Sequence, residues 1–170
     1  MSIVELNISE LLKEKKAERK LDLIIQEDGL YDGMEYIKLL RPISFVGILS
    51  KLENDFTLKG KVQGVLELIC SRCIEKFPYE LDITIVEKFT NVYKEDEDDE
   101  TIFIEDNVID ISQVVQNNII LTLPIKRLCK QNCKGLCQQC GTNLNKFKCQ
   151  CKNHDIDLRL AKLKDMFFTD

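Results

Sequence analysis

Residues 128–151 read LCKQNCKGLCQQCGTNLNKFKCQC and hold six of the eight cysteines of the chain. The segment contains no Asp or Glu. Zn²⁺ in structural sites takes four thiolate or imidazole ligands, which are usually delivered as closely spaced pairs. So many thiols in so short a segment indicate a zinc-binding C-terminal region.

One complete site is predicted within this segment. Cys137 and Cys140 have the spacing that turns both sulfur atoms toward one point, and Gly141 can adopt the left-handed conformation that ends such a turn. Cys149 and Cys151 point to the same face of an extended segment, because strand side chains repeat every two residues. We expect one ion to be bound by Cys137, Cys140, Cys149 and Cys151.

A second site would use the remaining four thiols. Cys70 and Cys73 form another closely spaced pair in CSRC, whereas Cys129 and Cys133 would share one face of a helical turn. The spacing leaves two partitions open. The favoured partition groups Cys70, Cys73, Cys129 and Cys133 in one site. It is favoured because Gly135 weakens any helix that leads from Cys133 to Cys137. The other groups Cys129, Cys133, Cys137 and Cys140 in one site, and Cys70, Cys73, Cys149 and Cys151 in the second.

Disulfides, an iron–sulfur cluster and thiol redox chemistry are the alternatives to zinc. The N-terminal sequence MSIVELNISELLKEKK lacks the apolar core of a signal peptide, which argues against an oxidising compartment. The close cysteine runs of familiar iron–sulfur proteins are absent, and CSRC lies between predicted strands, whereas redox pairs begin a helix. We therefore expect two zinc ions in a soluble cytoplasmic protein, with His154 as an exposed residue and not a ligand.

The remainder of the chain predicts an α+β fold. Residues 36–90 contain three β-branched and aromatic segments separated by short turns, as in an antiparallel meander or a partly open barrel. Pro42 predicts an edge or a strand start, and Gly60 and Gly64 predict bulges or bends. CSRC falls at a hairpin turn. Shorter strands are expected at 3–8, 20–26 and 101–106, with a loop at 27–33 and a solvated acidic loop at 95–100.

Three helices are expected to flank the β segments. Ser9 would cap a basic helix over 10–20, and Asp110 would cap a helix over 110–123, with Gln113 at the reciprocal position of the cap. Asp157 would cap a third helix over 155–168. The expected organisation is a core domain at 1–124, followed by a zinc-binding segment and C-terminal helix at 125–170. This second part would pack on the core through the site shared with Cys70 and Cys73.

Charge divides the chain unevenly. The net charge is −5, but residues 124–154 carry seven basic residues and no acidic ones, so the rest of the chain carries −12. The basic residues offset zinc-bound thiolates or meet phosphate groups. Enzyme motifs are absent: the chain has one histidine, no phosphate-binding glycine loop and no nucleophile elbow. The sequence predicts a protein that is not an enzyme.

Three features together resemble a known family. They are CSRC after a β segment, LCKQNCKGLCQQCGTNLN (128–145) after a helix that ends in Pro, and a closing LAKLKDMF. Over essentially its whole length the chain resembles the bacterial and plastid YceD-like proteins, called large ribosomal RNA subunit accumulation proteins. It departs from many of them at Gln138, where they have Pro inside the knuckle. The resemblance implies a role in making, processing or stabilising the 23S ribosomal RNA.

The segment predicted to contact RNA is residues 124–154, which contain basic residues but no Asp or Glu. It would hold the backbone of ribosomal RNA or a precursor particle by shape more than by sequence, because Phe147 is the only aromatic residue there. The predicted RNA-binding residues are Lys126, Arg127, Lys130, Lys134, Lys146 and Lys148. The competing hypothesis is an adaptor for a ribosomal protein or assembly factor, docking through the acidic loop or the C-terminal helix.

Overall fold

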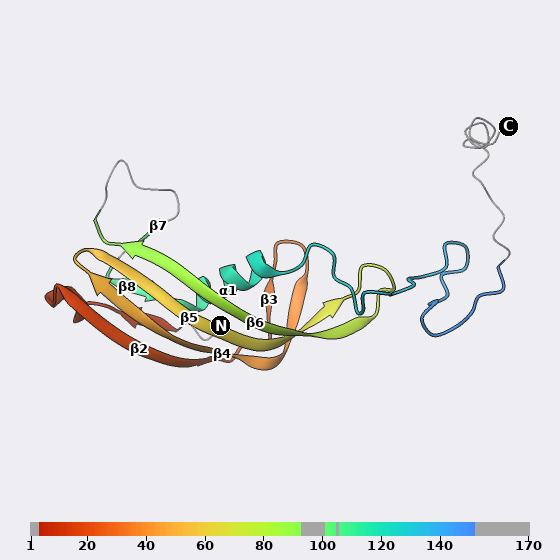
Figure 1. Ribbon diagram of the computed structural model, residues 1–170, viewed down its shortest axis with the longest axis horizontal. Helices are drawn as coiled ribbons and strands as arrows, with labels where there is room; N and C mark the ends of the chain where they lie inside the picture. The colour runs from red at the N-terminus through yellow and green to blue at the C-terminus, as the bar shows by residue number, and fades with distance from the viewer. Residues whose placement is uncertain (1–3, 93–100, 105, 152–170) are drawn as a thin grey trace, which may run out of the picture. The chain divides into compact units, whose positions relative to one another are not determined.

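The computed structural model describes residues 4–92, 101–104 and 106–151 (Figure 1). The chain divides into two compact units. The sheet unit comprises Met1–Ser71 and Glu75–Cys129, and the cysteine-rich unit comprises Arg72–Ile74 and Lys130–Asp170. The predicted helix at 155–168 and the acidic run at 95–100 lie outside the described residues.

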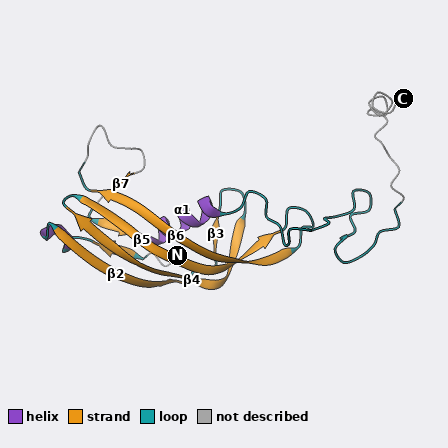
Figure 2. Ribbon diagram, in the orientation of Figure 1, coloured by secondary structure: helices purple, strands orange, loops and turns teal. Residues whose placement is uncertain are grey.

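The described part of the sheet unit contains a six-stranded sheet and a two-stranded sheet (Figure 2). The large sheet has the order β2-β4-β5-β6-β7, and β3 also pairs with β4. Its strands are β2 (Lys16–Ile25), β3 (Gly29–Tyr31), β4 (Tyr36–Leu52), β5 (Asp55–Ile69), β6 (Lys76–Thr90) and β7 (Thr101–Phe103). The small sheet pairs β1 (Glu5–Asn7) with β8 (Val108–Asp110).

The predicted antiparallel meander is confirmed for β4, β5 and β6. The large sheet ends at β2 on one edge and at β7 on the other. The described strands at these edges do not pair with each other, so the sheet is open and is not a barrel. Only β7 is parallel to its neighbour, β6. Glu53 and Asn54 form the tight turn between Leu52 and its partner Asp55, and CSRC lies in the turn between β5 and β6, as predicted.

The predicted helix over 10–20 is wrong. A single 3-10 turn, η1 (Leu11–Lys13), is followed directly by β2, and Ser9 caps nothing. The charged residues of this run are good helix formers, but they alternate with Ala17, Leu21 and Leu23, which face the core side of the sheet. Pairing of β2 with β4 over ten residues outweighs the local helix propensity.

Helix α1 (Ile111–Thr122) is close to its prediction. The Asp110 carboxylate accepts a hydrogen bond from the Gln113 backbone N–H at 3.0 Å, which satisfies one of the free donors at the helix start. The Gln113 side chain donates to Asn117 and does not return to the cap. The buried stripe of the helix contains Ile111, Val114, Val115 and Ile119, as expected from their spacing.

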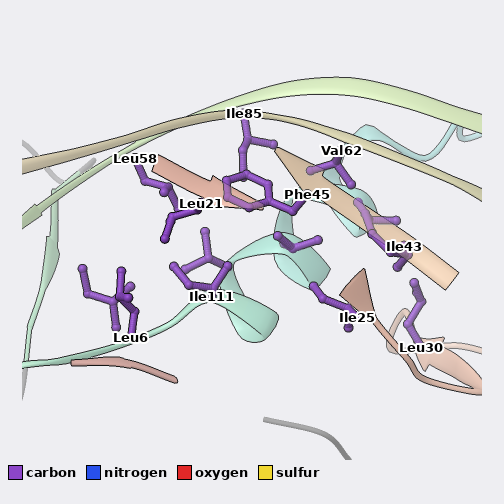
Figure 3. Close-up of a cluster of buried hydrophobic side chains, with 14 of the residues drawn as sticks. Leu6, Leu21, Ile25, Leu30, Ile43, Phe45, Leu58, Val62, Ile85 and Ile111 are labelled. Carbon is purple, nitrogen blue, oxygen red and sulfur yellow. The ribbon is translucent and has the colours of Figure 1, made fainter. Parts of the chain in front are cut away.

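The core lies between the large sheet and α1, and it follows from the alternation of side chains along the strands. Phe45, Leu58, Val62 and Ile85 come from the three central strands and lie beside Ile111 of α1 (Figure 3). At the β3 end of the same cluster, Leu30 lies near Ile25 and Ile43 (Figure 3).

The register of the long strands confirms the predicted bulge at Gly64, which lies opposite the shift between Arg41 and Ser44, but not the predicted place of Pro42. Pro42 lies inside β4, where the register with β5 shifts between Leu39 and Ser44, and not at a strand start. Gly60 is paired with Gly47 across β4 and β5, and the Phe45 ring occupies the space that their missing side chains leave. The predicted loop at 27–33 contains the short strand β3. No helix among the described residues is long and apolar enough to cross a membrane.

Candidate metal centres

The CSRC turn after β5 holds two buried thiols. Cys70 is 0% exposed and Cys73 is 4% exposed. The Cys70 N–H donates to the Glu75 carbonyl at 2.9 Å, and the Ser71 N–H donates to the Arg127 carbonyl at 2.7 Å. Ile74 has a φ of 58°, a conformation that a β-branched residue adopts only when its surroundings impose it. The turn is therefore fixed by backbone hydrogen bonds before any metal is considered.

The Cys129–Cys133 segment is a tight turn and not the predicted helical turn. The Cys133 N–H donates to the Lys130 carbonyl at 3.1 Å, an i to i−3 bond that is not continued. The Arg72 guanidinium donates to the Cys133 carbonyl at 3.0 Å, and the Arg72 carbonyl accepts from the Leu136 N–H at 3.2 Å. Gly135 has a φ of 74°, and a Cβ there would lie 3.1 Å from the Arg72 carbonyl oxygen. Arg72 thus fixes the turn that carries Cys133.

These segments bring together the first four-cysteine cluster. The sulfur atoms of Cys70, Cys73, Cys129 and Cys133 all lie within 4.8 Å of one another. Zn–S bonds of about 2.3 Å in a tetrahedron place sulfur atoms ~3.8 Å apart, so the four thiols need only small shifts to bind one ion. Cys133 also accepts a hydrogen bond from the Asn145 side-chain amide at 3.3 Å, the kind of outer contact that orients a ligand.

The second cluster lies further along the cysteine-rich unit. The Gly141 N–H donates to the Cys137 carbonyl and the Cys137 N–H donates to the Thr142 carbonyl, both at 2.9 Å. Gly141 has the left-handed φ of 70° that the prediction required. The sulfur atoms again lie within 4.8 Å of one another in the set Cys137, Cys140, Cys149 and Cys151. The eight thiols therefore group as in the favoured partition, and each set could hold a metal ion.

The four thiols of the second cluster are not equivalent. Backbone N–H groups of Cys140 and Gln139 lower the pKa of Cys137 to about 6, and hydrogen bonds from Thr142 lower the pKa of Cys140. Hydrogen bonding with Cys137 raises the pKa of Cys149, and hydrogen bonding with Cys140 raises that of Cys151 to about 12. The turn pair thus favours thiolates, whereas the later pair holds its protons more tightly, and a bound cation would favour their release.

The predicted RNA-binding lysines are exposed. Lys126 precedes the first cluster, and Lys130, Lys134, Lys146 and Lys148 belong to the cysteine-rich unit. The Lys134 N–H donates to the Asn145 side chain at 3.0 Å, and the Gly135 carbonyl accepts from the Leu144 N–H at 2.9 Å. These bonds place the loops that carry Lys134 and Lys146 side by side. Phe147 between the later lysines is 66% exposed.

Arg127 occupies a different environment from these lysines. Its guanidinium forms ion pairs with Asp32, at 2.5 Å, and with Glu35, and its side chain is only 16% exposed. Asp32 also accepts hydrogen bonds from the backbone N–H groups of Met34 and Glu35 in the turn between β3 and β4. This contact could not be predicted from the sequence, because its partners lie more than 90 residues apart. In this arrangement Arg127 holds the turn in place and does not present its charge to a ligand.

Replacing Arg127 with Gln is expected to lower the free energy of unfolding by about 1–2 kcal/mol at pH 7, because a charged hydrogen bond to the largely buried Asp32 carboxylate is lost. The Glu35 N–H, the Arg127 guanidinium and the Met34 N–H together lower the pKa of Asp32 from 3.8 to about 2. A lowered folded-state pKa stabilises the protein above pH 3.8, and that contribution disappears as the pH falls toward 2. Urea unfolding should therefore show Arg127→Gln and the parent converging between about pH 4 and pH 2.

A variant that keeps the charge tests the geometry. Arg127→Lys should lose most of the same stability at pH 7, because one ammonium group cannot span both carboxylates as the planar guanidinium does. A difference between Arg127→Gln and the parent that stays constant from pH 7 to pH 2 would contradict the role assigned to Asp32.

The sequence of this chain is similar to a family of known proteins. Residues 58–167 match the model described as "Large ribosomal RNA subunit accumulation protein YceD". The chain is 32% identical over 140 residues to the uncharacterized protein YlbN of Bacillus subtilis, covering 79% of each chain. It is 43% identical over 49 residues to the chloroplastic large ribosomal RNA subunit accumulation protein YCED homolog 1 of Arabidopsis thaliana, covering 29% of this chain and 15% of that protein.

The maize protein of the same name is 30% identical over 142 residues, which cover 65% of this chain and 48% of the maize protein. No solved structure is significantly similar to this chain. The family model covers most of β5, all of β6 and α1, and the eight cysteines that form both clusters. With that match and these relatives, the chain belongs to the YceD family of large ribosomal RNA subunit accumulation proteins.

Proposed function

We propose that this chain is a non-catalytic, zinc-binding ribosome biogenesis factor that promotes the synthesis, processing or stability of 23S rRNA in the cytoplasm. It binds ribosomal RNA or a precursor particle through the exposed lysines of its cysteine-rich unit. The family and the chloroplastic relatives named for accumulation of large-subunit RNA support the target.

The observation that carries the proposal is the combination of closed thiol clusters with exposed lysines between them. Each cluster offers four thiols, which fill a tetrahedral zinc site and leave no position open for a substrate. The ions therefore act on the fold: they fix loops that would otherwise lack a core. Lys130, Lys134, Lys146 and Lys148 are the exposed charges on those loops.

The charge balance sets the expected strength of binding. A zinc ion with four thiolates carries a net charge of about −2. The positive charge of the lysines must therefore exceed the negative charge of the nearby metal sites before the surface attracts phosphate. No Asp or Glu lies between Pro124 and His154 to add to that negative charge. The sheet unit, in contrast, carries the acidic excess, so we expect RNA to bind mainly at the cysteine-rich unit and only at low to moderate salt.

The test is RNA binding by a variant in which Lys130, Lys134, Lys146 and Lys148 are all replaced by Gln. A matched control replaces Lys13, Lys15, Lys16 and Lys20, which are exposed in the sheet unit, and changes the net charge equally. Binding of transcribed 23S rRNA fragments would be measured between 50 and 200 mM salt. The first variant should bind about 100-fold more weakly at low salt, with a salt slope smaller by roughly three, because about 0.7–0.9 ions are released per phosphate contact.

Equal binding by the two variants would overturn the assignment of the lysine surface. Failure of the parent to bind any rRNA fragment, together with salt-insensitive binding to a ribosomal protein or assembly factor, would favour the adaptor function.

A further inference from the structure

Two tyrosines form an exposed aromatic pair on the sheet unit. Tyr31 of β3 lies directly opposite Tyr36 of β4 in the antiparallel register, so both side chains project from the same face. They are 63% and 61% exposed. Their neighbours Leu30 and Ile37 point to the opposite face and are buried at 3% and 2% exposure. The tyrosines therefore contribute nothing to the core that Leu30 joins (Figure 3).

Both rings are held in place although they are exposed. The Tyr31 hydroxyl donates to the Gly33 carbonyl at 3.0 Å, which holds that ring along the turn. The Tyr36 ring lies over Gly29, where an added Cβ would come within 2.6 Å of its Cζ atom. A side chain at position 29 would push the ring away. Restrained rings lose less conformational entropy when a flat ligand binds to them.

A lysine lies beside the two tyrosines. Lys38 is paired with Gly29 in the same ladder, projects from the same face as Tyr36 and is exposed. The acidic groups of the turn between the two tyrosines, Asp32 and Glu35, are already paired with Arg127. Glu67, opposite Lys38 on β5, is paired with Lys76 at 2.7 Å. Among the described residues around this pair, Lys38 is the cation without a partner carboxylate.

From this arrangement we propose that Tyr31 and Tyr36 form a stacking site for unpaired bases of single-stranded RNA, with Lys38 contacting the adjoining phosphate. The site rests on the proposed function and adds a second contact outside the cysteine-rich unit. Bases stack on exposed aromatic rings of a sheet regardless of sequence, because every base has a flat π-face. An exposed tyrosine ring beside a lysine offers a stacking face and a positive charge, which match a base and its phosphate.

The experiment uses a single-stranded 12-nucleotide RNA and the same backbone lacking its bases. Tyr31→Leu and Tyr36→Leu remove the rings but keep apolar bulk, whereas Tyr31→Phe and Tyr36→Phe keep the rings. Each Leu variant should bind the RNA about 10-fold more weakly at 50 mM salt, and each Phe variant should stay within about 2-fold of the parent. None of the four should change binding of the base-free strand, and RNA should quench tyrosine fluorescence in the parent.

Lys38→Gln provides the electrostatic readout, because it should lower the salt slope by about one while leaving the tyrosine quenching in place. Leu variants that bind as tightly as the parent would overturn the stacking site, and so would equal losses on the base-free strand. Those results leave the lysine surface standing if the fourfold Lys→Gln variant still loses affinity. A parent that binds no RNA, but whose tyrosines are protected by a protein partner, would overturn both proposals.

Discussion

If the two clusters bind zinc as proposed, Cys133→Ser is expected to lower the zinc content from two ions to one and the melting temperature of the sheet by about 10 °C or more. Cys133 is 3% exposed, and its cluster includes Cys70 at the end of β5. A serine hydroxyl is a poor zinc ligand, so the other three thiols, two of them buried, would be left without their ion. Structural zinc contributes about 10–16 kcal/mol in small peptides, and losing even a third of that removes much of a domain's stability.

Cys140→Ser is the matched variant. Cys140 belongs to the second cluster and is exposed, and that cluster lies wholly in the cysteine-rich unit. The variant should also contain one zinc ion in place of two, but its sheet should melt within about 2 °C of the parent. Metal content per chain and circular dichroism of the β signal on heating would distinguish the two. Equal melting of the variants would contradict the separate roles of the clusters, and visible colour with bound iron would contradict zinc.

The two knuckle turns could be predicted because their signals are local. Which pairs share a site could not be fixed in the same way, because Cys70 and Cys73 join Cys129 and Cys133 from far along the chain. Two C-x-x-C pairs with turn residues beside them define knuckles whatever the rest of the chain does. The α1 cap was predictable for the same reason, since Asp110 and Gln113 are three residues apart. The meander followed from three long alternating segments between Tyr36 and Thr90.

The predictions that were wrong or missing concern residues whose structure depends on partners far away in the sequence. The 10–20 run has strong helix formers, and only pairing with β4 makes it a strand. Arg127 looked like one more basic residue near the cysteines until the turn at Asp32 and Glu35 was placed beside it. The Tyr31–Tyr36 pair was hidden because 27–33 has the composition of a loop, and its strand forms only against β4.

Gly60 is the second position where a small change should have a large effect. A Cβ at Gly60 would lie 2.4 Å from Phe45 Cε2 and 2.9 Å from the Val46 carbonyl oxygen. Phe45 is fully buried in the core, so its ring cannot swing into solvent. Gly60→Ala should therefore lower the free energy of unfolding by about 2–3 kcal/mol, the range for overpacking a well-packed core.

Gly64→Ala on the same strand separates the clash from the general effect of replacing glycine. The nearest atom to a Cβ there is Ile43 Cγ1 at 3.3 Å, so this variant should lie within about 1 kcal/mol of the parent in urea unfolding. Phe45→Ala alone should cost about 3–5 kcal/mol. In that background Gly60→Ala should cost clearly less than in the parent, because the clash with the ring is gone and only the close approach to the Val46 carbonyl oxygen remains. If the two costs simply add, the ring does not occupy the Gly60 site and the packing described for the centre of the sheet is wrong.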